Sequence, residues 1–122
     1  MHVGVADVRP AAGSWRTKWL IGNDGRDDLA LTRIHAPHRR YRADPRALDI
    51  AIGPDQTTAL DLDLRVDAAG GEIENAFLIL TLGSGASAWR ILTRLRVRMD
   101  GGVPWPLVER IDVQEVGFSG SG

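Results

Sequence analysis

The stretch 58-TALDLDLRVD-67 decides the fold, because apolar and charged side chains alternate along it. Successive side chains of an extended strand point to opposite faces. One face of this stretch is therefore apolar and the other charged, which is typical of an antiparallel strand with one side in water. The apolar face carries Leu60, Leu62, Leu64 and Val66.

The same alternation recurs along the chain, interrupted by turns rich in Gly, Pro, Asn and Asp. One segment, 76–82, is apolar at nearly every position, which predicts a central strand covered on both faces. Another begins at Leu29 and brings Ile34 to the same face only if a β-bulge intervenes. Further strands are expected over 15–21, 48–52, 89–99 and 107–118. The pattern predicts seven antiparallel strands in a two-layer sandwich, with a small β-barrel as the alternative.

The bulk composition is that of one ordinary globular domain: 122 residues, 43% hydrophobic, 25% charged, with a net charge of −1. We expect a single domain over 1–122, with residues 1–12 and 119–122 mobile. The lack of cysteine excludes disulfides and thiolate metal ligands. The start of the chain is unlike a secretory signal and no apolar run is long enough to span a membrane, so we expect a cytoplasmic location and no membrane partner.

The turns and strands follow a definite order: an Asn-x-Gly turn, a Leu-x-Leu strand, a Gly-Pro turn, an alternating strand and a hydrophobic strand. They are represented by Asn23 and Gly25, Leu29 and Leu31, Gly53 and Pro54, Leu60, Leu62 and Leu64, and Phe77 and Ile79. This order resembles the immunoglobulin-like modules of the Hydin type and their bacterial, adhesion-like relatives. The resemblance implies an immunoglobulin-like β-sandwich with a scaffold role, and it supplies no catalytic residues.

The stretch 33-RIHAPHRRYRAD-44 is the densest cluster of polar side chains, and we expect it to be a loop because Pro37 disfavours regular pairing. His35 and His38 are candidate metal ligands, but a zinc site needs more ligands than this pair. Carboxylates in a neighbouring turn are candidates for a loose calcium site. They are Asp24, Asp27 and Asp28. An ordinary polar loop and a capped turn are the favoured interpretations, so no metal or other cofactor is expected.

An anionic ligand, such as a nucleic acid or an acidic polysaccharide, is a second interpretation of this cluster. Arginine guanidinium groups can contact phosphates while Tyr41 stacks on a base. The residues concerned are Arg39, Arg40 and Arg42, extended by a stripe on one strand face that holds Arg90, Arg94, Arg96 and Arg98. The alternative is that the stripe pairs with carboxylates, and the nearly balanced charge favours this alternative over nucleic-acid binding. The carboxylates considered are Asp61, Asp63, Glu109, Asp112 and Glu115.

The four tryptophans raise a carbohydrate-binding alternative, but three of them fall on faces assigned to the core. Trp105, between two prolines, is expected to be partly exposed and suits a protein contact. No segment carries a nucleophile or phosphate-loop motif, so we expect no enzymatic activity. The sequence therefore predicts a structural or protein-interaction module that binds another protein, or itself, through a strand edge or a loop.

Overall fold

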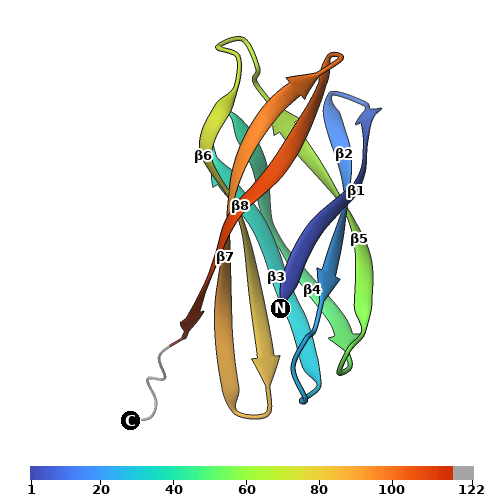
Figure 1. The fold of residues 1–122 in the computed structure, drawn as a ribbon, viewed down its shortest axis with the longest axis vertical. Coiled ribbons are helices and arrows are strands. Elements are labelled where there is room, and N and C mark those ends of the chain that lie inside the picture. Colours follow the sequence, from blue (N-terminus) through green and yellow to red (C-terminus); the bar gives the residue numbers. More distant parts are fainter. Residues whose placement is uncertain (117–122) are drawn as a thin grey trace.

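The computed structural model describes residues 1–116, which form eight antiparallel strands and no helix (Figure 1). The strands are β1 (His2–Ala11), β2 (Ser14–Gly22), β3 (Leu29–His38), β4 (Tyr41–Ile52), β5 (Thr57–Val66), β6 (Ile73–Ser84), β7 (Ser87–Asp100) and β8 (Val103–Glu115). The all-β prediction is confirmed, but the count of seven strands is wrong. None of the elements in this part of the chain is a helix of the length and apolarity that a membrane span requires.

The strands form one nearly closed, barrel-like sheet in the order β1-β2-β5-β4-β3-β6-β7-β8. Its two end strands, β1 and β8, contact each other. The weakest junction of the sheet lies between β4 and β5, which share only the register pairs Tyr41 with Val66 and Arg42 with Arg65. This wrapped sheet is nearer to the barrel alternative than to the sandwich expected from the sequence.

The eighth strand comes from the start of the chain, where residues 1–12 were expected to be mobile. Strand β1 instead pairs with β2 from His2 to Ala11, and a register shift between Val5 and Asp7 interrupts the pairing. The shift allows both Val3 and Val8 to be buried although they lie an odd number of positions apart. The expected mobility of residues 119–122 lies outside the described residues.

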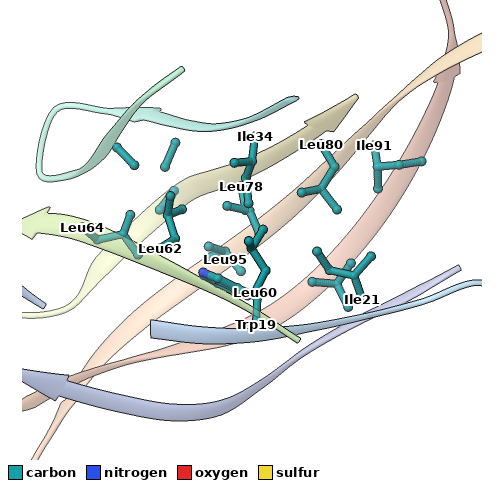
Figure 2. Close-up of a cluster of buried hydrophobic side chains, with 14 of the residues drawn as sticks. Trp19, Ile21, Ile34, Leu60, Leu62, Leu64, Leu78, Leu80, Ile91 and Leu95 are labelled. Carbon is teal, nitrogen blue, oxygen red and sulfur yellow. The ribbon is translucent and has the colours of Figure 1, made fainter. Parts of the chain in front are cut away.

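The interior is a single apolar cluster of buried side chains from β1 to β7, and the half-buried Val108 and Ile111 of β8 pack against it (Figure 2). Trp19 of β2 and Leu95 of β7 are fully buried, and the leucines of the 58–67 stretch face the same interior, as predicted. Strand β6 differs from the expectation of cover on both faces, because Phe77 and Ile79 are only half-buried. A barrel-like sheet has one interior, so the second face of β6 turns outward.

Candidate functional site

The stretch 33–44 forms the hairpin between β3 and β4, so the prediction of a loop there is wrong. Pro37 pairs with Arg42 and His38 pairs with Tyr41, and the turn of the hairpin contains two residues. A proline removes one backbone donor, which a strand tolerates where that donor is not needed for the ladder. The hairpin therefore continues past Pro37 instead of ending there.

Tyr41 points into the interior and is 1% exposed. Burial raises the pKa of its phenol well above the ordinary value, so the group stays neutral. The ring is inaccessible to a stacking base. Tyr41 serves as a core residue at the point where β4 still pairs with β5.

The two histidines of the hairpin have separate surroundings. The Nδ1 atom of His38 accepts a hydrogen bond of 3.1 Å from the backbone N–H of Arg40, which fixes the turn. His35 is half-buried and lies next to Ile79 of β6. Within residues 1–116, no group of three or more His, Asp or Glu side chains is arranged to hold a metal ion.

The acidic turn between β2 and β3 is held by its own contacts. Asp24 forms an ion pair with the N-terminal amino group at 3.1 Å, and its other oxygen is hydrogen-bonded to Nδ1 of His2 at 2.9 Å. Hydrogen bonds from these two groups lower the pKa of Asp24. Asp27 and Asp28 are exposed beside it, and the backbone carbonyl of Asp27 accepts a hydrogen bond from the Asn23 amide.

Two of the three turn arginines are engaged with neighbouring groups. Arg40 donates to the backbone carbonyls of Asp67 at 3.1 Å and Gly71 at 3.2 Å, which ties the β3–β4 turn to the loop between β5 and β6. Arg42 forms an ion pair of 3.2 Å with Asp44. Arg39 is exposed and makes no side-chain hydrogen bond within residues 1–116.

Two arginines of the β7 stripe, Arg96 and Arg98, form ion pairs with carboxylates. Arg96 lies within 3.0 Å of Glu72, 3.4 Å of Glu74 and 2.9 Å of Glu109. Arg98 lies 3.2 Å from Glu72. Arg98 and Arg96 lower the pKa of Glu72, and Glu109, followed by Glu72, raises the pKa of Arg96.

Arg94 completes this network through an uncharged partner. Its guanidinium donates to the Oδ1 atom of Asn75 at 3.1 Å. Asn75 has a φ of 57° at the bulge of β6, and such left-handed dihedrals are adopted more readily by Asn than by most residues. The bulge thereby aims an amide at the middle of the stripe.

The β5–β6 loop connects the β3–β4 turn to one end of the stripe. Arg40 donates to the carbonyl of Gly71, and the next residue, Glu72, forms ion pairs with Arg96 and Arg98. Arg40 is therefore close to these two stripe arginines, and a carboxylate lies between them. Around these three arginines the surface is a network of paired groups rather than an open cationic patch.

The expected pairing partners of the stripe are confirmed for one carboxylate, Glu109. Asp61 and Asp63 instead face Arg9 at 3.8 Å and Arg16 at 2.8 Å, on β1 and β2. Glu72 and Glu74, which carry much of the pairing, were missed. Their position between a glycine turn and a strand was the available signal, but only the folded loop brings them to the stripe.

The tip of the β7–β8 hairpin gathers apolar side chains around Trp105. Met99 and Leu107 are each 37% exposed, and together with Trp105, Arg98 and Asp100 they line a shallow depression of about 300 Å³. Trp105 is half-buried and pairs in register with Arg98. The sequence predicted a partly exposed Trp105 but missed the apolar side chains beside it.

Comparison with known proteins does not assign a family: no protein-family model, curated protein or solved structure matches the chain. The resemblance to immunoglobulin-like modules therefore rests on the order of turns and strands alone.

Proposed function

We propose that the chain is a non-enzymatic protein-interaction module that contacts its partner through the tip of the β7–β8 hairpin. The observation that carries this proposal is the grouping of exposed apolar side chains. Of the three large hydrophobic side chains that are exposed within residues 1–116, Met99 and Leu107 lie beside Trp105.

The composition of this tip suits a protein contact. Tryptophan and arginine are enriched among the residues that contribute most to binding, and they act best in a patch with a polar rim. Trp105 and Leu107 supply the apolar centre, whereas Arg98 and Asp100 supply the rim. The proposed partner therefore offers an apolar pocket for the indole and polar groups around it that match the rim.

The test compares capture from the native host by the wild type and by Trp105→Ala, followed by binding of the purified partner. Removing an anchor of this kind weakens binding by about thirtyfold or more. Val113→Ser is the matched control, because Val113 is 60% exposed and lies on β8 away from the hairpin tip. A partner that the wild type and Val113→Ser bind equally, and Trp105→Ala does not, supports the proposal.

Two results would contradict this contact surface or identify a different occupant. If a purified partner binds Trp105→Ala as tightly as it binds the wild type, the hairpin tip is not the contact surface. If sedimentation shows a concentration-dependent dimer that Trp105→Ala abolishes, the occupant of the tip is a second copy of this chain.

Pairing through a strand edge is a second candidate, favoured by the short register between β4 and β5. Beyond Arg42 the two strands diverge, and Arg46 crosses the opening to the Asp61 carbonyl at 3.3 Å. Against this candidate, strand β4 carries Pro45 and two register shifts, which are features by which natural sheets discourage the addition of a strand. A dimer that survives Trp105→Ala would favour this edge.

Binding of a polyanion through the predicted arginines has less support from the geometry. Arg40, Arg42, Arg96 and Arg98 already contact carbonyls or carboxylates, so a polyanion that binds there would have to displace these groups. Retention on heparin that weakens steeply with salt would revive this alternative.

A further inference from the structure

Arg33 of β3 and Arg90, the first arginine of the β7 stripe, line a concavity on the outer surface of the sheet. The register places Arg33 of β3 opposite Thr81 of β6, and Thr81 opposite Arg90 of β7. Two strand spacings separate the arginines, which is about 10 Å between their Cα atoms. Two long side chains at this separation can reach a common ligand above Thr81. Figure 1 shows these three strands side by side.

The concavity has a volume of about 390 Å³ and a defined lining. Its walls are Arg33 with His35 on one side and Arg90 with Gln114 on the other, and Thr81 lies between them. The floor is apolar and consists of the half-buried side chains Ile79 and Leu92.

A β-bulge creates this arrangement. The sequence predicted a bulge between Leu31 and Ile34, and the register of β3 shifts there against both neighbours. The extra residue returns Ile34 to the core and turns Arg33 and His35 outward. Bulges commonly redirect side chains in this way beside functional sites.

The charges of this concavity are not compensated as they are elsewhere on the surface. No carboxylate lines it, and within residues 1–116 neither Arg33 nor Arg90 forms an ion pair or a side-chain hydrogen bond. By contrast, the concavity that contains Arg16 and Arg46 also holds three aspartates. These aspartates are Asp44, Asp61 and Asp63.

The surroundings of His35 lower the pKa of its imidazole. The causes are burial, followed by the positive charges of Arg33 and Arg90. Two carboxylates lie on strands beside the concavity, and both are ion-paired. Asp112 of β8 is the register partner of Leu92 and pairs with Arg110 at 2.9 Å. Asp44 lies in the β4 bulge opposite His35 and pairs with Arg42 and Arg65.

We propose that this concavity binds an organic phosphate, with the phosphate group between Arg33 and Arg90 and an apolar body on Ile79 and Leu92. Guanidinium groups donate paired hydrogen bonds to phosphate oxygens. The hydroxyl of Thr81 and the amide of Gln114 can supply further donors. The apolar floor selects an ester over the free ion.

The test is a titration of the full chain with phenyl phosphate at constant ionic strength, followed by NMR of its three histidines. We expect a saturable change at His35 and a higher His35 pKa, while the signals of His2 and His38 stay in place. Inorganic phosphate should bind about fivefold more weakly, the factor that burial of roughly 40 Å² of apolar surface gives. Phenol, which lacks the charge, should leave His35 unchanged.

Arg33→Gln and Arg90→Gln should each weaken phenyl phosphate binding by about fivefold or more. Arg39→Gln is the control, because it removes the same charge from an exposed position on the β3–β4 turn. All three positions are exposed, so the variants should fold, and the same spectra verify this. Equal responses of all three histidines, or wild-type affinity in both Arg33→Gln and Arg90→Gln, would overturn the proposal.

Discussion

Asn23 is the residue whose replacement should reveal most about the stability of the fold. It is 2% exposed, and its side-chain amide donates to the carbonyls of Asp27 at 2.8 Å and Ile52 at 2.9 Å. Its Oδ1 atom accepts from the backbone N–H of Gly25 at 3.0 Å. The backbone of Asn23 also bonds to Gln56 and Asp55, so one residue clamps the β2–β3 turn to the β4–β5 turn.

We expect Asn23→Ala to reduce the free energy of unfolding by about 3 to 4 kcal/mol. The variant loses three side-chain hydrogen bonds at roughly 1 kcal/mol each, and it leaves the buried carbonyl of Ile52 without this donor. Urea denaturation followed by tryptophan fluorescence measures the change. Gln56→Ala is the control: it removes one exposed bond of 2.7 Å to the Gly53 N–H, so it should cost about 1 kcal/mol or less.

Asn23→Asp tests the same reasoning through pH. The new oxygen would face the carbonyls of Asp27 and Ile52, which together with burial should raise the pKa of the carboxyl. A carboxyl with a raised pKa in the folded state loses stability as the pH rises from the unfolded value through the folded one. The variant should therefore be less destabilised near pH 4 than near pH 7. A cost below about 1 kcal/mol for Asn23→Ala, or no such pH dependence for Asn23→Asp, would refute the clamp.

Three further substitutions give independent outcomes. Thr93→Val should raise the free energy of unfolding by about 1 kcal/mol, because the buried Thr93 hydroxyl has no hydrogen-bond partner among the described residues. An unchanged or lower midpoint of thermal unfolding in this variant would show that the hydroxyl does have a partner. Asn75→Ala should be less stable than Asn75→Gly by about 1 kcal/mol in urea denaturation, because a φ of 57° is strained for alanine and not for glycine. A higher stability of Asn75→Ala than of Asn75→Gly would contradict this backbone conformation. Glu72→Gln should flatten the fall in stability below about pH 4.5. The lowered pKa of Glu72 stabilises the fold above that pH, and this contribution is lost as the pH falls through the pKa of the folded state. An unchanged pH profile of unfolding would show that the ion pairs of Glu72 with Arg98 and Arg96 do not act in solution.

Alternation along the chain was enough to predict the strands that cross the core without irregularity. Strand β5 has its leucines inside and its aspartates outside, and the bulge before Ile34 follows from the same rule. The prediction failed where bulges shift the period. Ala43 and Ile52 are both buried on β4 although they lie nine positions apart, so the alternation of inward and outward side chains must change between them, in the interval where the register against β3 is irregular.

The candidate sites depended on contacts between distant segments, and the sequence could indicate these only in part. Residue types identified Arg96 and Trp105 as candidates, but not Glu72 as the partner of Arg96. The pairing depends on the path of the β5–β6 loop and on the bulge at Asn75. Arg33 and Arg90 were not linked because no local pattern tells which strands become neighbours of β6.

The short register between β4 and β5 has a consequence for the cooperativity of unfolding. It divides the order of strands into a group of three, β1-β2-β5, and a group of five, β4-β3-β6-β7-β8, which share two register pairs. The groups are therefore held together mainly by the interior side chains that both contribute, including Trp19 from one and Leu95 from the other. Backbone ladders make each group coherent, whereas the packed interior makes the two groups a single unit.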